Sequence, residues 1–400
     1  MIVKPRLLNT SVAKIKHASL QHAQSFRICR DGLLSAPRSL MLDGIISYGG
    51  GTGKSIELVR KGFGEYYERN HFFTAVPLTS KKKLSDINPV SHQKKLASLC
   101  QNIEQQHSNH HFALTQVHNL YTQEPYDYFY NAISLRTMKN DNPFLSVSDS
   151  CACASHTHKD KALYHSLIEF LERQALLGSW MSKTIRYSIN PQVLHQISPY
   201  THLVETLLDN GDIYIFENGN QLPGYNVIMF YFAQSPEDAV QYSVGCKTAG
   251  SLSDAICSAF EELYQCYTFL YGSVFKETNL ENKAGTGYHM AFVQYNHQET
   301  KSRIPYFNKA STHLIHTKED IDCLPQFSYN RMLEELKHIS TDIYYYHYFE
   351  QGLGLHFTKI LSPDFFAHMS LNKPLNLQCR YARVLNIDPG QAYLEMLPFP

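Results

Sequence analysis

Three segments of the chain share one pattern, and this repetition limits the possible folds more than any other feature. Each segment places apolar residues at helical spacing around a polar pair three residues apart, and such pairs lie on one face of a helix. The segments are residues 55–73, 159–177 and 253–270, and their pairs are Glu65 with Glu68, Glu169 with Glu172, and Glu262 with Gln265. They lie roughly a hundred residues apart, which is too far for a solenoid of short repeats. We therefore predict three amphipathic helices within one larger fold.

Six runs rich in Val, Ile, Tyr and Phe, with turn residues nearby, predict strands. They are residues 128–135, 212–216, 225–232, 241–244, 341–348 and 355–361. Pairs of strands that alternate with long helices favour an α/β or α+β fold whose sheets are covered by helices. No Pro- or Ser-rich linker separates the three helices. We expect an N-terminal segment, residues 1–40, followed by a single composite domain, residues 41–400.

The composition excludes several classes of protein. The 400 residues include 36 basic and 36 acidic side chains, and this balance argues against a protein that mainly binds nucleic acid. No run approaches the roughly eighteen apolar residues of a membrane span, so we expect no membrane association through such a segment. The nine cysteines are few and odd in number, which argues against a disulfide framework. We expect a cytoplasmic protein.

The two glutamate pairs admit two interpretations. Glutamates three apart on a helix usually form a solvated face, but closely spaced like charges repel and gain little there. Four converging carboxylates would suit Mg²⁺, which takes oxygen ligands and often bridges to nucleotide phosphates. An arginine follows each pair at once, at Arg69 and Arg173, and either could hold a phosphate or pair with a carboxylate. These residues alone leave the solvated face and the metal–nucleotide site about equally supported.

The stretch 49–55, GGGTGKS, resembles a phosphate-binding P-loop but lacks its first glycine, because Tyr48 stands there. A glycine-rich turn would still allow backbone N–H groups to approach an anion, and Lys54 could reach a phosphate. A flexible surface turn explains the same residues equally well.

A cluster of Cys and His precedes the second predicted helix. Cys151, Cys153, His156 and His158 are residue types that bind zinc, but their spacing is short for a zinc site. We therefore favour packed, reduced thiols and solvated imidazoles over a metal site.

Several motifs together resemble the YcaO family. They are GEYYERNHFF at residues 64–73, IEFLER at 168–173, EELYQ at 261–265, SPDFFAHM at 362–369 and the terminal PFP at 398–400. The resemblance runs from about Ser47 to the last residue and is strongest to the discrete YcaO subunit of microcin-type thiazole/oxazole synthetases. It implies an α+β fold of the YcaO type, with the repeated ExxER and ExxQ helices around one nucleotide site.

The resemblance also implies roles for individual residues. Glu65, Glu68, Glu169 and Glu172 would hold Mg²⁺, while Lys54, Arg69, Arg173, Glu262 and Gln265 would lie near ATP. The C-terminal carboxylate of Pro400 would act as the catalytic base, because prolines stiffen the tail. Several positions depart from the usual pattern and put the phosphate contacts in doubt, namely Lys61, Lys161, Ser258 and Met396.

The implied activity is that of an ATP-dependent peptide cyclodehydratase. Such an enzyme activates backbone amides of a ribosomally made precursor peptide, so that Cys and Ser side chains close thiazoline and oxazoline rings. The resemblance implies three partners: the precursor with its leader, an E1-like leader-binding subunit, and a flavin (FMN) dehydrogenase subunit. Two alternatives remain open at this stage. One is another ATP-dependent amide chemistry such as thioamide formation, and the other is a non-catalytic ATP-binding scaffold.

Overall fold

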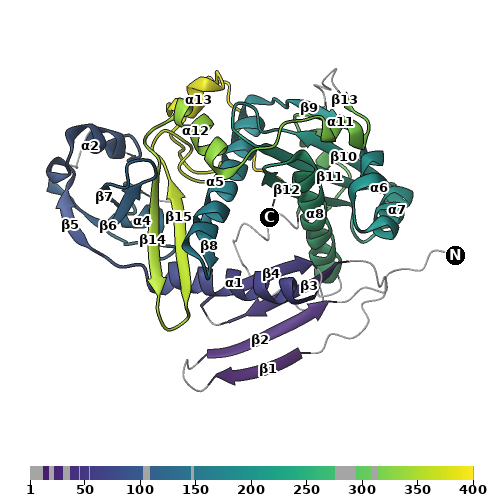
Figure 1. Ribbon diagram of the computed structural model, residues 1–400, viewed down its shortest axis with the longest axis horizontal. Helices are drawn as coiled ribbons and strands as arrows, with labels where there is room; N and C mark the ends of the chain where they lie inside the picture. The colour runs from purple at the N-terminus through teal and green to yellow at the C-terminus, as the bar shows by residue number, and fades with distance from the viewer. Residues whose placement is uncertain are drawn as a thin grey trace.

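The computed structural model describes residues 12–17, 22–29, 37–44, 46–53, 55–101, 109–145, 148–274, 294–307 and 314–399. Within these ranges the strands form three sheets, and three long helices lie between them (Figure 1). The long helices are α1 (Ser55–Thr74), α5 (Lys159–Ser182) and α8 (Leu252–Val274). All three predicted helices are confirmed, each extended at its C-terminal end. No helix in the described part of the chain is long and apolar enough to cross a membrane.

The first sheet is antiparallel and ends at a glycine-rich strand. Its strands, in spatial order, are β1 (Val12–His17), β2 (His22–Cys29), β3 (Arg38–Asp43) and β4 (Tyr48–Gly53). The predicted turn over the glycine run was therefore wrong. The glycines are required by packing: a Cβ on Gly49 would lie 2.5 Å from the carbonyl oxygen of Gly62 on α1. Glycine in a strand often marks such a close approach of two backbones. The expected boundary at residue 40 falls within β3.

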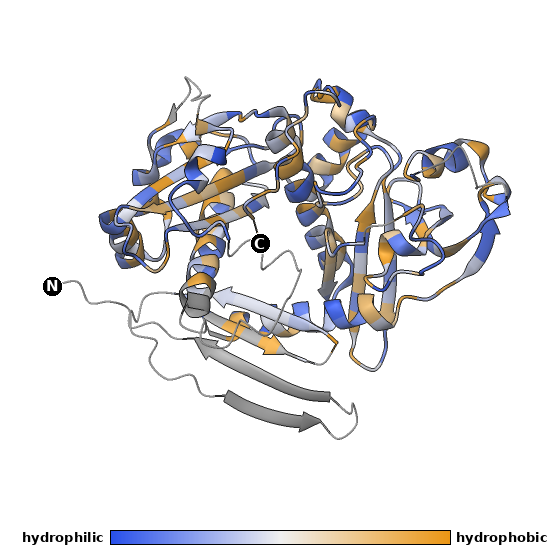
Figure 2. Ribbon diagram, turned by 180° about the vertical axis from the view of Figure 1, so that it is seen from behind, coloured by the Kyte–Doolittle hydropathy of each residue, from blue (hydrophilic) through white to orange (hydrophobic). Residues whose placement is uncertain are grey.

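The second sheet is covered on both faces. Its strands, in spatial order, are β12 (Tyr242–Ala249), β11 (Tyr225–Ala233), β10 (Gly211–Glu217), β9 (Tyr187–Ile189) and β13 (Leu314–Ile315). Alternate residues of a strand point to opposite faces. Val227, Met229 and Tyr231 accordingly pack with α8, while Phe230 packs with the α5 side of the sheet. This placement on both faces explains why every residue of β11 is buried, and Figure 2 shows hydrophobic residues along these strands.

The third sheet packs against α1 and α5. Its strands run in the order β5 (Ser80–Lys83), β6 (His111–Asn119), β14 (Tyr344–Glu350), β15 (Leu355–Leu361) and β8 (Cys153–His156), and β7 (Pro125–Phe129) also pairs with β6. The predicted strand 128–135 was correct only at its start, because the chain turns into α4 (Tyr130–Ile133). The other predicted strands are confirmed, residues 355–361 with the same ends and the rest with shifted ends. The fold is α+β, as predicted.

Shorter helices cover the outer surfaces. They are η1 (Leu84–Asp86), α2 (Val90–Ala97), η3 (Pro191–Val193), α6 (Leu194–Ile197), α7 (Thr201–Asn210), α10 (Thr300–Arg303), α11 (Lys318–Asp322), α12 (Tyr329–Ile339) and α13 (Arg380–Val384).

Candidate ATP and magnesium site

The site forms where the edge strands of the three sheets meet the three long helices. Strand β4 contacts α1 and α8, β12 contacts α8 and α5, and β8 contacts α5 and α1. Edge strands carry backbone N–H groups that no neighbouring strand can bind. Here helix glutamates accept two of them: Gly50 donates to Glu65 Oε2 at 2.7 Å, and Cys246 donates to Glu262 Oε2 at 2.7 Å. Glu65 and Glu262 therefore hold α1 and α8 to the sheet edges.

Helix α1 contributes Glu65, Glu68 and Arg69. The Arg69 guanidinium lies 3.0 Å from Glu65 Oε1, donates to Ser150 Oγ at 3.0 Å, and stacks over the Tyr48 ring at 4.8 Å. The pKa of Glu68 is raised well above its usual value, first by burial and then by the nearby charge of Glu169 on α5, against an opposing effect of Arg69. Glu68 and Glu169 thus approach each other across the two helices.

Helix α5 contributes Glu169, Glu172 and Arg173. Burial raises the pKa of Glu169 to about 7, although Arg173 opposes that shift. Arg173 lies 3.6 Å from both Glu169 and Glu172. Burial also raises the pKa of Glu172, and the cations of Lys247 and Arg173 counter it. The solvated-face interpretation was wrong for Glu172, whose side chain is only 2% exposed.

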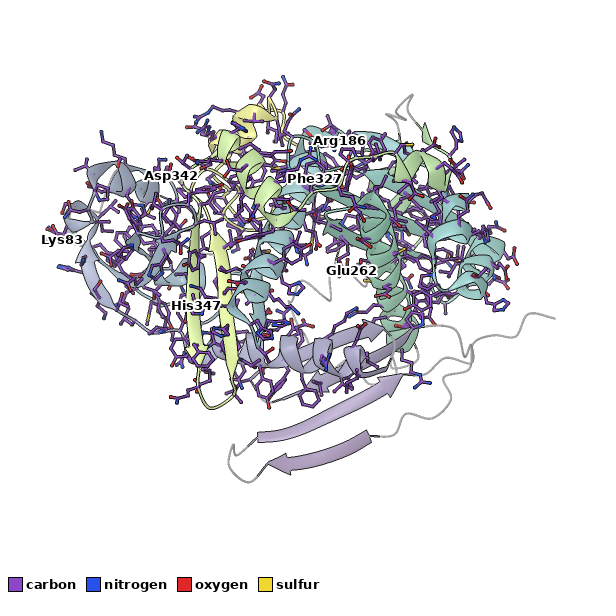
Figure 3. The ribbon with its side chains drawn as sticks, viewed as in Figure 1. Lys83, Arg186, Glu262, Phe327, Asp342 and His347 are labelled. Carbon is purple, nitrogen blue, oxygen red and sulfur yellow. The ribbon has the colours of Figure 1, made fainter. Side chains whose placement is uncertain are left out.

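Lys247, on β12, is a site residue that sequence reasoning missed. Its Nζ lies 3.0 Å from Glu262 Oε1 and 3.5 Å from Glu172 Oε2, so it joins α8 to α5. Burial alone would lower the pKa of Lys247, but Glu172 and Glu262 raise it above its usual value. Figure 3 shows Glu262 on the side of α8 turned toward α5. A lone charged residue in an otherwise uncharged strand, YSVGCKTA, was the available signal.

The carboxylates fit a magnesium ion that is shared with a nucleotide. The buried Oε1 atom of Glu172 makes no hydrogen bond, only an ion pair with Arg173 at 3.6 Å, so it can accept a further donor or cation. Within the described ranges no three His, Cys, Asp or Glu side chains form a ready-made metal site. Mg²⁺ does not require one, because it usually binds through one or two carboxylates together with waters and substrate phosphates. Glu68, Glu169 and Glu172 are the residues that would hold it.

The remaining predicted site residues differ in how well they are placed. Gln265 follows Glu262 by one turn on α8. Lys61, which departs from the family pattern, donates to the carbonyl of Thr52 at 3.0 Å and lies 3.3 Å from Glu261, so it links α1 to β4 and α8. Lys54 and Pro400 lie outside the described residues.

The last described residues are held against the site. Phe399 is 2% exposed, and Arg173 lies 5.0 Å from the centre of its ring. The carbonyl of Pro398 accepts a hydrogen bond from Tyr242, and that of Met396 accepts one from Tyr295 at 3.0 Å. The tail is therefore anchored beside Arg173.

The Cys and His residues before α5 lie in different surroundings. Cys153 is buried in the core of the third sheet, and His158 is exposed. The interpretation as packed thiols stays a prediction, which zinc content by elemental analysis and the activity of Cys153→Ser would check.

Three helices that carry repeated polar pairs surround one shared site, and two of them are hydrogen-bonded to the edge of a sheet. This arrangement defines the class of protein. The profile of the YcaO family, described as YcaO cyclodehydratase, ATP- and Mg²⁺-binding, matches residues 60–366, and the chain belongs to this family. It is an ATP-dependent cyclodehydratase with ATP and Mg²⁺ as its cofactors, so the predicted enzyme class and cofactors are confirmed.

The chain is similar to particular members of the family. It is 27% identical over 369 residues to the microcin B17-processing protein McbD of Escherichia coli, covering 87% of this chain and 89% of that protein. It superimposes on a chain of the E. coli microcin synthetase McbBCD complex with a TM-score of 0.86 at 23% identity, over 97% of this chain and 100% of that one. The same complex with pro-MccB17 bound gives a TM-score of 0.85 at the same identity and coverage. YcaO from Methanopyrus kandleri, bound with AMPPCP and Mg²⁺, gives 0.57 at 11% identity, over 88% and 85% of the two chains.

Proposed function

We propose that the chain is the cyclodehydratase subunit of a thiazole/oxazole synthetase that acts on a ribosomally made precursor peptide. The observation that carries the proposal is the convergence of Glu68, Glu169 and Glu172 with Arg69 and Arg173, beside a C-terminal tail anchored at Phe399. The relation to McbD supports a role of this kind. We place the reaction in the cytoplasm, where such precursors are made and thiols stay reduced.

The reaction begins when a Cys thiol or Ser hydroxyl of the peptide attacks the preceding backbone carbonyl. ATP then phosphorylates the resulting oxygen, and loss of phosphate leaves the azoline ring and ADP. Mg²⁺ supplies charge neutralisation at the transferring phosphoryl group. The two arginines are planar donors suited to phosphate oxygens, and Arg173 is held in place by Glu172 and Phe399. In such a reaction positioning supplies most of the acceleration.

A base must remove protons from the attacking group and the amide nitrogen. We propose the carboxylate of Pro400 for this role. The anchoring of Pro398 and Phe399 supports it, because a base must be held within hydrogen-bond reach of its proton.

The proposal includes partner subunits. Assembly with an E1-like leader-binding subunit and with a flavin dehydrogenase that oxidises azolines to azoles is suggested by the three-part McbBCD complex. Residues 41–400 would act as one composite domain within that assembly.

Reconstitution tests the function. The chain is mixed with its candidate partners, a precursor peptide, ATP and Mg²⁺, and mass spectrometry follows the loss of one water per ring. We expect rings and ADP in equal amounts with the partners present, and very little of either without them. Thioamide formation would instead show the mass gain of oxygen replaced by sulfur. A non-catalytic scaffold would bind ATP and give no turnover under any condition.

A further inference from the structure

The motif SPDFFAHM lies outside the nucleotide site and lines a cavity of about 150 Å³. Phe366, Ala367 and Met369 of the motif form part of the wall. Tyr128 and Phe170 contribute aromatic side chains to the same wall. The cavity is therefore a largely apolar space at the junction of the third sheet and α5.

The wall of the cavity includes a residue of the nucleotide site, Arg173. Arg173 and Lys359 lie in its wall, together with Asp149. Lys359 donates to the carbonyl of Asp149 at 2.6 Å, and the next residue, Ser150, accepts from Arg69 at 3.0 Å. The segment around Ser150 thus lies between the carboxylate helices and the cavity. Lys359 and Arg173 offer only donor groups, which suit peptide carbonyl oxygens.

The wall of the cavity is held in place by hydrogen bonds. Gln174, next to Arg173, donates to the carbonyl of Phe366 at 3.0 Å and accepts from its N–H at 2.9 Å. Asn376 accepts from the N–H of Ala367 at 2.9 Å, and Asp149 accepts from the N–H of Met369 at 2.9 Å. A cavity fixed in this way is preformed, as ligand pockets usually are.

We infer that this cavity takes an apolar side chain of the peptide substrate, from a residue that flanks the activated amide. The inference rests on the proposed function. The activated carbonyl has to lie near the phosphate-binding Arg173, and the side chains on either side of it branch from the backbone only a few bonds away. A cavity of about 150 Å³ with apolar walls can hold a group as large as a benzene ring. Arg173 and Lys359 in its wall outnumber the single carboxylate, Asp149, and therefore disfavour basic side chains.

The test uses the complete assembly with three precursor peptides. They carry Leu before the cyclised Cys, Leu after it, or Gly at both positions. Peptide affinity is measured by fluorescence anisotropy with a non-hydrolysable ATP analogue, and ring formation is measured separately. We expect one of the Leu peptides to bind roughly tenfold more tightly than the Gly peptide, the effect of a few methylenes in a pocket.

Variants at the rim make the test specific. Ala367 and Ser98 are exposed and line the cavity, so Ala367→Trp and Ser98→Trp obstruct it without disturbing the core. Each should abolish the preference for Leu and leave ATP affinity and binding of the Gly peptide unchanged, while Ala367→Ser should retain the preference. Equal binding of all three peptides by the wild type, or a preference that survives both Trp variants, overturns the inference. A Leu preference without ring formation would refute the proposed function and leave the cavity assignment standing.

Discussion

The two ExxER motifs place the same residues in different surroundings. In the motif on α1, Glu65 is 31% exposed and its oxygens already accept hydrogen bonds from Gly50 and Arg69. In the motif on α5, the counterpart Glu169 is similarly exposed, at 28%, but its arginine, Arg173, lies 3.6 Å away. The second glutamate, Glu172, is 2% exposed, and its Oε1 atom makes no hydrogen bond and lies 3.6 Å from Arg173. In the first motif, Glu65 is therefore satisfied by hydrogen bonds from the protein itself. In the second motif, the carboxylates make only longer ion pairs with Arg173 and Lys247, and this difference indicates that the ligand completes the α5 side of the site.

The largest expected effect concerns the metal-facing glutamates. Glu68→Gln and Glu172→Gln should each abolish Mg²⁺-dependent nucleotide binding, because each removes a negative charge from the metal position while keeping nearly the same shape. Calorimetric titration with an ATP analogue measures the change, and circular dichroism checks the fold. Glu57→Gln, on an exposed position of α1, is the matched control and should bind normally. Normal binding by both site variants would mean that the two motifs are structural.

The second effect tests the C-terminal tail, which is anchored beside Arg173 of the α5 motif. Adding two residues after Pro400 should slow ring formation by roughly 10²–10⁴-fold, the usual contribution of a positioned base, and should leave ATP affinity unchanged. An N-terminal extension serves as the control. Ring formation at the normal rate would exclude the tail carboxylate as the base. Loss of ATP binding in the extended protein would instead mean that the tail supports Arg173 structurally.

Much of the fold and of the site was predictable from the sequence, and the features that were missed have physical causes. Helical periodicity located all three helices, because their apolar stripes reflect local geometry. The strand at Gly49 was read as a turn, since only the packed structure shows that α1 leaves no room for a Cβ there. Lys247 was missed because its partners, Glu172 and Glu262, lie on other elements and meet it only in the folded chain.

The third effect tests whether the cation on β12 stabilises the α5 side. Lys247→Met leaves the buried Glu172 without its nearest lysine and should lower the free energy of unfolding by about 2–3 kcal/mol, below the range for fully buried pairs because Lys247 is 33% exposed. Urea denaturation measures it. Lys61→Met is the matched control on the α1 side, where the pair with Glu261 is half exposed, and should cost less than about 1 kcal/mol. Equal losses of unfolding free energy in the two variants would contradict the expected difference between the α5 side and the α1 side.

The smallest effect is a pH dependence that arises from Glu169. Burial raises its pKa from an ordinary value near 4.5 to about 7, so between these values the folded state binds more protons than the unfolded state. Stability of the metal-free protein should therefore be highest below about pH 4.5 and fall as pH rises toward 7, with the opposite sign from a salt-bridged carboxylate.

Mg²⁺–nucleotide affinity should rise over the same interval, because the metal requires the ionised carboxylate. Thermal melting from pH 5 to 8 measures the first trend without Mg²⁺ and the second with Mg²⁺ and an ATP analogue. Glu169→Gln should make the metal-free profile less steep, with Glu68 and Glu172, whose pKa values burial also raises, supplying the remaining slope, whereas Glu57→Gln should leave the profile unchanged. A wild-type profile that rises with pH in the absence of metal would mean that Arg173 outweighs burial at Glu169, and the α5 motif would then be as fully satisfied by the protein as the α1 motif.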